Sequence, residues 1–528
     1  MKNRIKQYLL AASMCVGLTA CSDFFEPIPG VQFGLDETFA SKQRTEEYLN
    51  NVYSYVREVT DAIHPNTYGG IFTEASLDGA NRWNKTYAEW TNGSFNSASA
   101  QASEYFSKYY QAIAKASTFI QNVDKCTEAA ASTRGKWKSE ARALRAYYYF
   151  ELLRLYGPIP LIGEDPIPLD ASLEELIKER NSVDECVNFI ATELQSAIDS
   201  GDLLQRAGKA NLGRMDVATC MALKAKLYLY WASPLFNGNT DQASVKNKDG
   251  KQLFPQTEDH SKWTQTRDAY ERFMTFATGQ GYKLTEVYTN GKLDPYASCR
   301  AAGEFFTTTW EAVDELIFVK LRDLYDYTYW VCPKFTDFQD TDVTGGGGYY
   351  TTQETVDLFF TKDGLTIEED PGYDKFEGIP GANNFTSGRY YDPNNPSRLY
   401  FDADKSKVLK QWKDREPRFY VNITYSGSIW LNEGKYNEEM RTDFTNGANG
   451  TCGKSKASGD CPDSGYLIRR GAKASNNNGS KHFSPVLRLA DMYLGYAEAL
   501  CMCSDLDNAL TYPVSYTHLR AHETKANL

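Results

Sequence analysis

Residue patterns typical of catalysis are missing from this sequence, and histidine itself occurs only 5 times in 528 residues. His64, His260 and His482 lie far apart, and the chain has neither a His-Glu-x-x-His zinc motif nor a Gly-x-Ser-x-Gly nucleophile turn. Carboxylate pairs that could serve a glycosidase stay open, because the 69 acidic residues offer many candidates and their separation is a spatial property. We therefore predict a protein that is not an enzyme.

An excess of positive charge is missing as well. The chain carries 57 basic and 69 acidic residues, a net charge of −12, and no basic stripe. Because an acidic surface repels phosphate backbones, the sequence excludes nucleic acid as a partner. After residue 20 no apolar run reaches the ~20 residues that a membrane-spanning helix needs, so we expect the body of the protein to be soluble.

Two loops look like ligand sites but lack the residues that such sites require. The glycine run TGGGG at 344–348 is not followed by the Lys-Ser/Thr of a phosphate-binding loop, which predicts a flexible loop instead. Asp337, Asp340 and Asp342 could hold calcium, but they lack the glycine and terminal glutamate of an EF-hand. A solvated loop is favoured there, and we predict neither metal nor cofactor.

The spacing of the cysteines does not predict a disulfide framework. Beyond Cys21 the cysteines are scattered, and several fall inside apolar helical patterns, where a cysteine behaves as a small buried hydrophobe. Cys452 and Cys461 bracket a loop rich in glycine and serine. In an oxidising compartment these two could pair, and the sequence does not decide between a bond and separate thiols.

The first 20 residues are typical of a signal peptide. Lys2, Arg4 and Lys6 precede an apolar run from Tyr8 to Ala20, which is too short to span a bilayer comfortably. The run ends in Leu-Thr-Ala followed directly by Cys21, as in a bacterial lipobox. Since each buried methylene contributes about 0.8 kcal/mol, several acyl chains on Cys21 would hold the mature protein on a membrane. The alternative is an ordinary signal peptide with an incidental cysteine.

Much of the first half predicts helices, because apolar residues recur at steps of three and four. In one of them Ala141, Leu144, Tyr148, Leu152 and Leu155 share a face, and Gly157 and Pro158 follow. Ala146 and Phe150 have the small-to-large spacing of tetratricopeptide helix pairs. The expected helices lie at 103–121, 138–157, 181–198, 215–233 and 485–503. We predict a mainly α fold, with a scaffold of tetratricopeptide-like helix pairs at 38–235 and 485–503.

Between 236 and 484 the periodicity gives way to glycine, asparagine, aspartate, proline and tyrosine, which favour turns. Long loops inside a compact protein are usually functional, so this stretch predicts a large, irregular, loop-rich cap. We expect one binding domain at 21–512. From about Pro513 the sequence shows neither periodicity nor a helix cap, and we interpret 513–528 as a non-native tail.

Aromatic residues make up 14% of the chain, and two clusters of them lie in polar segments. Trp83, Tyr87 and Trp90 are spaced to share one helical face among amide and charged side chains. In the second cluster a strand would place three tyrosines on one side and a tryptophan on the other: Tyr325, Tyr327, Tyr329 and Trp330. A flat ring flanked by hydrogen-bonding groups suits a sugar, so both clusters are candidate ligand-binding residues. The alternative for each is packing in the core, and Tyr349 and Tyr350 are weaker candidates.

Five segments resemble, in order, the signature blocks of the SusD/RagB family: residues 140–162, 213–238, 351–359, 414–430 and 485–500. The resemblance implies a nutrient-binding lipoprotein at the outer membrane and cell surface of Bacteroidota, with four tetratricopeptide-like helix pairs and a ligand site on the loop-rich face. It also implies a SusC-like TonB-dependent transporter as partner. Asp23 and Glu26, close behind Cys21, are similar to the surface-export signal of such lipoproteins.

These features predict a lipoprotein that binds an oligosaccharide or polysaccharide without covalent chemistry and delivers it to the transporter. Two or three aromatic platforms with a few hydrogen bonds correspond to a Kd of roughly millimolar to tens of micromolar. Three alternatives stay open: a RagB-like lipoprotein that binds peptides, a surface glycoside hydrolase, and a structural lid without a ligand of its own.

Overall fold

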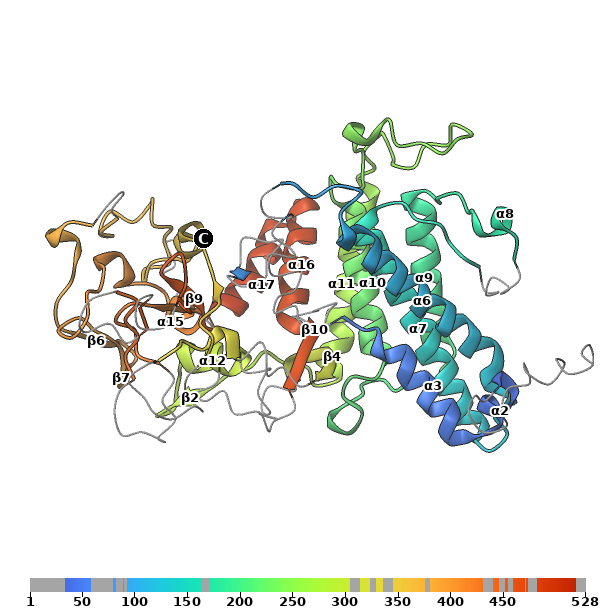
Figure 1. Ribbon diagram of the computed structural model, residues 1–528, viewed down its shortest axis with the longest axis horizontal. Coiled ribbons are helices and arrows are strands. Elements are labelled where there is room, and N and C mark those ends of the chain that lie inside the picture. The colour runs from blue at the N-terminus through green and yellow to red at the C-terminus, as the bar shows by residue number, and fades with distance from the viewer. Residues whose placement is uncertain are drawn as a thin grey trace, which may run out of the picture.

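The molecule is elongated, with parallel rows of helices at one end and short strands among loops at the other (Figure 1). This computed structural model describes residues 34–57, 79–81, 89, 93–163, 171–303, 314–322, 329–335, 345–375, 380–430, 440–445, 452–453, 459–470, 472 and 482–518. The signal peptide, Cys21, Asp23 and Glu26 therefore lie outside the described residues. No described helix is both long enough and apolar enough to cross a bilayer.

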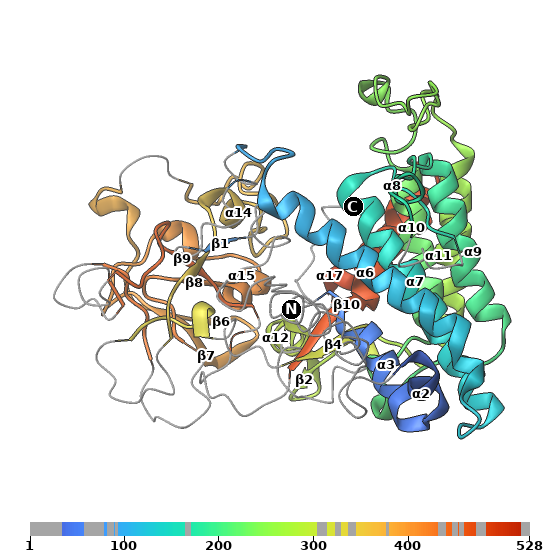
Figure 2. The same cartoon turned by 45° about the vertical axis from the view of Figure 1, so that its right-hand side comes forward.

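The helical end is a chain of helices in which each packs on the next. The long helices are α3 (Lys42–Ser54), α6 (Ala100–Asn122), α7 (Ala131–Tyr156), α9 (Val183–Asp199), α10 (Val217–Ala232), α11 (Ser261–Gly279), α16 (Leu489–Met502) and α17 (Leu506–His518). Contacts run from α6 to α7, α9, α10, α11, α16 and α17 in that order. Figure 2 shows the same succession from a second side. The predicted mainly α fold is confirmed, and we call this part the scaffold.

Helix α7 lies at the centre of the scaffold and is buried on nearly every side. The predicted apolar face is largely buried, but Tyr147, Tyr149 and Phe150 on other faces are buried too. They are covered because α6 and α9 pack on opposite sides of α7. The helix ends where Gly157 adopts φ +68°, a conformation that glycine tolerates and other residues rarely adopt. The prediction of one apolar face therefore understated how much of this helix is buried.

Helix α11 corrects the predicted boundary between scaffold and cap. It lies inside the stretch 236–484 that the sequence assigned to the cap, yet it packs against α10 and α16. A Cβ atom on Gly495 of α16 would lie 2.3 Å from the hydroxyl of Tyr270, so glycine permits this close approach. The rings of Tyr270 and Tyr496 stack alongside, with centroids 6.3 Å apart.

The C-terminal region also differs from expectation. The predicted helix 485–503 begins later, because strand β10 (His482–Arg488) precedes α16 and pairs antiparallel with β4 (Leu316–Arg322). Helix α17 then runs to His518, past the predicted end of regular structure at Pro513. Tyr512 packs against Tyr493 and Tyr496 of α16, at centroid distances of 5.5 and 4.6 Å. The tail is thus helical up to His518, and its last ten residues lie outside the described part.

The cap is more regular than its turn-rich sequence suggested. A small antiparallel sheet has the order β1 (Ala80–Asn81), β5 (Tyr349–Tyr350), β9 (Tyr466–Ile468) and β8 (Ile423–Tyr425). Strands β6 (Arg389–Asp392) and β7 (Asn395–Asp402) form a separate hairpin, and the helices α12 (Pro295–Gly303) and α15 (Pro417–Asn422) pack together.

The cap has a hydrophobic core of its own, made largely of aromatic side chains. Its larger members are Tyr296, Tyr400, Phe401, Trp412, Phe419, Tyr420, Tyr425 and Tyr466. Many of the aromatic residues that make this sequence unusual are therefore structural. The strands β4 and β10 and the scaffold helices α16 and α17 lie between this core and the other long helices of the scaffold (Figure 1).

Candidate functional site

Most of the predicted aromatic ligand residues fall outside the described part of the chain. This applies to Trp83, Tyr87, Trp90, Tyr325 and Tyr327, and also to the aspartates of the possible calcium loop. The ligand role of these five aromatics stays a prediction. Among the described residues no group of three or more His, Cys, Asp or Glu side chains is placed to hold a metal ion.

Tyr329 and Trp330 are described, and they pack beneath the glycine run. The two residues are helical, so the predicted strand-like alternation is wrong at this point. The N–H groups of Gly346 and Gly348 donate to the carbonyl oxygens of Tyr329 and Trp330, at 2.8 and 3.0 Å. A Cβ on Gly346 would lie 2.5 Å from the Trp330 ring and 2.7 Å from the Tyr329 ring.

This packing fits the core alternative for Trp330, which contacts a small apolar cluster of the cap. The glycines 345–348 permit close approach to two rings, so this part of the run is packed and not merely a flexible loop. Tyr349, one of the weaker candidates, is fully buried and offers no ring surface to a ligand. Cys452 and Cys461 are both buried as well.

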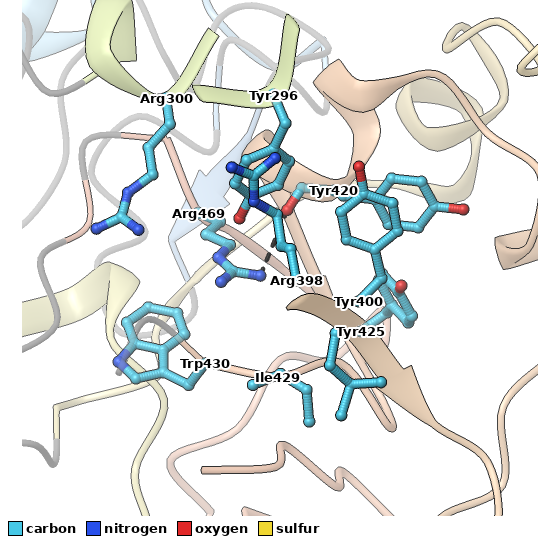
Figure 3. Close-up of a pocket in the computed structure, with 10 residues that line it drawn as sticks. Tyr296, Arg300, Arg398, Tyr400, Tyr420, Tyr425, Ile429, Trp430 and Arg469 are labelled. Atoms are coloured by element: carbon cyan, nitrogen blue, oxygen red, sulfur yellow. Dashed lines mark hydrogen bonds between the residues drawn. The ribbon is translucent and has the colours of Figure 1, made fainter. Parts of the chain in front are cut away.

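A pocket of about 140 Å³ lies inside the cap, and we call it the cap pocket (Figure 3). Its lining comes from α12, β7, α15, β8 and the segments that follow β8 and β9. The lining residues are Tyr296, Arg300, Arg398, Leu399, Tyr400, Tyr420, Tyr425, Ile429, Trp430 and Arg469. Segments far apart in the sequence therefore meet in one polar, aromatic cavity.

Stacked rings form one wall of the cap pocket. The rings of Tyr400 and Tyr420 are nearly parallel, with centroids 3.9 Å apart, and Tyr296 lies 5.5 Å from Tyr400. The hydroxyl of Tyr420 donates to the Trp412 carbonyl oxygen at 3.0 Å and accepts from the Arg415 N–H at 3.3 Å. Because both its face and its hydroxyl are occupied by protein partners, Tyr420 holds this wall in place.

Arg398 is paired within the protein. Its guanidinium donates to the Asp294 carboxylate at 2.8 and 3.0 Å and to Asp392 at 2.6 Å, and it lies 4.3 Å over the Tyr296 ring. Burial would raise the pKa of Asp294, but the Arg398 hydrogen bonds and the Ala297 N–H outweigh it and lower that pKa. The charge of Arg398 is thus balanced inside the fold.

Three other polar atoms that line the pocket have no hydrogen-bond partner within the described structure. They are the hydroxyl of Tyr425, the indole Nε1 of Trp430 and Nε of Arg469, and each is buried. Buried polar groups are almost always partnered, so an unmatched group calls for a ligand or an ordered water. Three residues of the cap pocket lining therefore carry a polar group without a protein partner.

A second hollow, of about 280 Å³, lies between α3 and β4. Its polar groups serve the protein itself. The Tyr53 hydroxyl donates to Glu140 at 3.0 Å and accepts from the Met215 N–H at 2.9 Å, and Arg214 pairs with Glu140 at 2.7 Å. Lys320 donates to the Ser54 carbonyl oxygen at 2.8 Å. Because these partners satisfy one another, this hollow is the weaker candidate.

No local pattern in the sequence marks the cap pocket. Tyr420, Tyr425 and Trp430 lie in the block 414–430, which was noted only for its family resemblance. Tyr296 and Arg469 belong to segments that show no motif, and only the fold brings them together. A site assembled from separated segments is visible in space and not along the chain.

Comparison with known proteins places the chain among similar folds. Residues 315–523 match the model of the SusD family, and residues 32–229 match a family described as starch-binding and associating with the outer membrane. A SusD-like protein of Bacteroides ovatus is 27% identical over 175 residues, which are 32% of this chain and 30% of that relative. The chain therefore aligns with less than a third of the length of this curated relative.

Two solved structures are similar over most of the chain. The protein BT4246 is 22% identical with a TM-score of 0.74, covering 92% of this chain and 83% of its own. A SusD-like carbohydrate-binding protein of Bacteroides fragilis is 18% identical with a TM-score of 0.60, covering 90% and 79%. At these identities the likeness establishes the fold.

Proposed function

This chain belongs to the SusD/RagB family, and from that premise we propose that it is a surface-exposed outer-membrane lipoprotein. In this proposal it binds an oligosaccharide or polysaccharide without covalent chemistry and delivers it to a partner TonB-dependent transporter. The observation that carries the glycan assignment is the cap pocket, where aromatic rings surround three buried donors without protein partners.

Carbohydrates suit such a lining for two physical reasons. The C–H face of a sugar packs on an aromatic ring, and its hydroxyl oxygens accept hydrogen bonds from N–H and O–H donors. Aromatic rings and hydrogen-bond donors can therefore contact different sides of the same sugar. Trp430 contributes its indole N–H in this proposal.

The similar proteins favour the same ligand class. The family model that matches residues 32–229 is described as starch-binding, and the solved structure from Bacteroides fragilis is named carbohydrate-binding. We transfer this class to the chain as part of the proposal. Trp83, Tyr87 and Trp90, with Tyr325 and Tyr327, would add aromatic rings for more than one sugar in this proposal.

The mode of attachment and the partner complete the proposal. Cleavage before Cys21 and its acylation would anchor the domain 21–512 to the outer membrane. A SusC-like transporter next to that anchor would receive the glycan. Binding with a Kd of roughly millimolar to tens of micromolar suits this role, because the ligand must be released again.

Calorimetric titration tests the proposal. The mature chain from Ser22, without the anchor, is titrated with plant, host and microbial glycans and with mixed peptides. We expect saturable binding to a glycan that is weakened in Tyr425→Phe, which alters the cap pocket, and in Trp83→Ala or Trp90→Ala. Tyr288→Ala is the control, because Tyr288 is a 60% exposed aromatic on β2 (Tyr288–Thr289), which is not part of either cluster. Binding of peptides alone, or of nothing, would contradict the glycan assignment.

A further inference from the structure

We infer that the cap pocket binds an acidic group of the glycan, a carboxylate or a sulfate, with the guanidinium of Arg469 as its main partner. The inference rests on the proposed function, because it assumes that the ligand is a glycan. It adds a charge class that neither the family models nor the similar structures name.

Arg469 is a buried cation without a counter-charge. Only 7% of the residue is exposed, and its Nη1 donates to the Tyr420 carbonyl oxygen at 3.3 Å while Nε has no partner. No carboxylate of the described residues pairs with it. Burial lowers the pKa of Arg469, since removing the guanidinium from water disfavours its charged form.

The other two arginines that are buried in the described structure have more protein partners. Arg145 pairs with Glu193 at 2.8 Å, and Arg415 donates to the carbonyl oxygens of Val356 and Phe359, both at 2.6 Å. The Nε atom of Arg415, like that of Arg469, has no hydrogen-bond partner in the described structure. Arg469 differs from both because it lines the cap pocket, where a ligand could supply the charge opposite to its own.

A second arginine strengthens the positive character of the cap pocket. Figure 3 shows the guanidinium groups of Arg300 and Arg469 both turned toward the indole of Trp430. Arg300 disfavours the charge of Arg469, and the guanidinium of Arg469 lies 5.5 Å over the Trp430 ring. An anion placed beside both arginines would relieve this repulsion and would accept charge-assisted hydrogen bonds.

The size of the pocket limits what enters it. About 140 Å³ is well below the ~300–1,000 Å³ of pockets that enclose a drug-sized ligand. The cap pocket therefore has room for one acidic sugar or one acidic substituent, while the rest of the glycan stays outside. Tyr425 and Trp430 provide neutral donors for the remaining oxygens of that group.

The experiment compares charged and neutral forms of the same glycan on the whole mature chain. One pair is tetragalacturonate and its fully methyl-esterified form, which tests a carboxylate. The other is a sulfated galactan tetrasaccharide and its desulfated form, which tests a sulfate. Each is titrated into the wild-type protein, into Arg469→Gln, and into Arg418→Gln. Arg418 pairs with Glu416 at 2.5 Å and does not line the pocket, so it controls for loss of a nearby arginine.

In at least one pair we expect the charged form to bind the wild-type protein about tenfold tighter than the neutral form. This preference should disappear in Arg469→Gln and persist in Arg418→Gln. The pair that shows it identifies the acidic group. We also expect Arg469→Gln not to lower the thermal midpoint of the free protein, because it removes an uncompensated buried charge.

Equal binding of the charged and neutral forms to the wild-type protein would overturn this inference and leave the proposed function standing. Retention of the preference in Arg469→Gln would overturn it too. If no glycan binds at all, the inference and the proposed function both fail. Should Arg469→Gln not fold, thermal shifts of the wild-type protein with the same four glycans decide, since the charged form of at least one pair should raise the thermal midpoint more than its neutral form at equal concentration, and equal shifts in both pairs would overturn the inference.

Discussion

Tyr420 and Tyr425 are both buried tyrosines of the cap pocket, but their hydroxyl groups have opposite roles. The hydroxyl of Tyr420 bonds to Trp412 and Arg415, whereas the hydroxyl of Tyr425 has no partner in the described structure. A partnered hydroxyl stabilises the fold, and an unpartnered buried one costs stability. The first serves the protein, and we assign the second to the ligand.

Substitution by phenylalanine separates these roles. Tyr420→Phe should lower the free energy of unfolding by about 1 kcal/mol, because a buried hydrogen bond is lost. Tyr425→Phe should leave that free energy unchanged or slightly higher, yet weaken glycan binding. Urea unfolding and calorimetric titration of both variants give the two readouts. An equal loss of stability in both variants would contradict the assignment of Tyr425.

Gly346 shows how one missing side chain shapes the cap. Because a Cβ there would overlap the rings of Trp330 and Tyr329, Gly346→Ala should displace them and destabilise the protein by about 1–3 kcal/mol. Gly163→Ala is the matched control, since no neighbouring atom lies within 4 Å of its Cβ position. Thermal unfolding followed by tryptophan fluorescence compares the two. Similar midpoints would show that this packing is loose.

Helix α10 begins with a buried aspartate. The carboxylate of Asp216 accepts from the N–H groups of Thr219 and Ala207, both at 2.7 Å. Burial still raises the pKa of Asp216 to about 6, against these hydrogen bonds that lower it. The pKa of this carboxyl in the unfolded chain is 3.8, so the folded state binds the proton more tightly. The stabilisation that protonated Asp216 gives the folded state is therefore complete below pH 3.8 and is lost as pH rises through 6.

Asp216→Ser should therefore remove the pH-dependent free-energy cost of ionising this buried carboxyl, while the serine hydroxyl can still accept the N-cap hydrogen bond. From pH 4 to pH 7 the stability of the variant relative to the wild type should rise by about 2 kcal/mol. Asp259→Ser is the control. Hydrogen bonds from Ser261 lower the pKa of Asp259 from 3.8, so its titration falls below this range and the stability of that variant relative to the wild type should stay nearly constant from pH 4 to pH 7. Urea unfolding at both pH values measures this, and a flat response of Asp216→Ser would contradict it.

Helices were predictable where periodicity and caps agree. The helix at 181–198 begins with the capping box of Ser182 and Glu185, and the structure forms both of its hydrogen bonds. Helix α11 was missed although Trp263, Tyr270 and Phe273 recur with helical spacing, because its neighbours are rich in turn residues. The pairing of β4 with β10 and the cap pocket depend on contacts between distant segments, which no local pattern encodes.

At the scale of the whole molecule, we expect membrane anchoring and ligand binding to depend on different residues. Cys21→Ala should release the protein from the outer-membrane fraction, because the acylation site is lost, and should leave glycan affinity unchanged. Cys501→Ala is the control, since Cys501 is an exposed cysteine of α16. Fractionation of cells that express each variant gives the measurement. A Cys21→Ala variant that stays in the membrane fraction would rule out the lipid anchor.

The division into scaffold and cap separates the long packed helices from the pocket. The scaffold is held together by long helices with buried ion pairs such as Arg145 with Glu193, while the cap encloses the pocket with its unpartnered donors. In the proposed function the ligand is held at this pocket without covalent chemistry.

Recovery of the ligand after binding tests this central claim most directly. The mature chain is incubated with a glycan selected by titration, at concentrations that saturate it, the protein is then denatured and removed, and all of the sugar is analysed by mass spectrometry. The account predicts that the glycan returns intact. Shortened or modified sugars would contradict it.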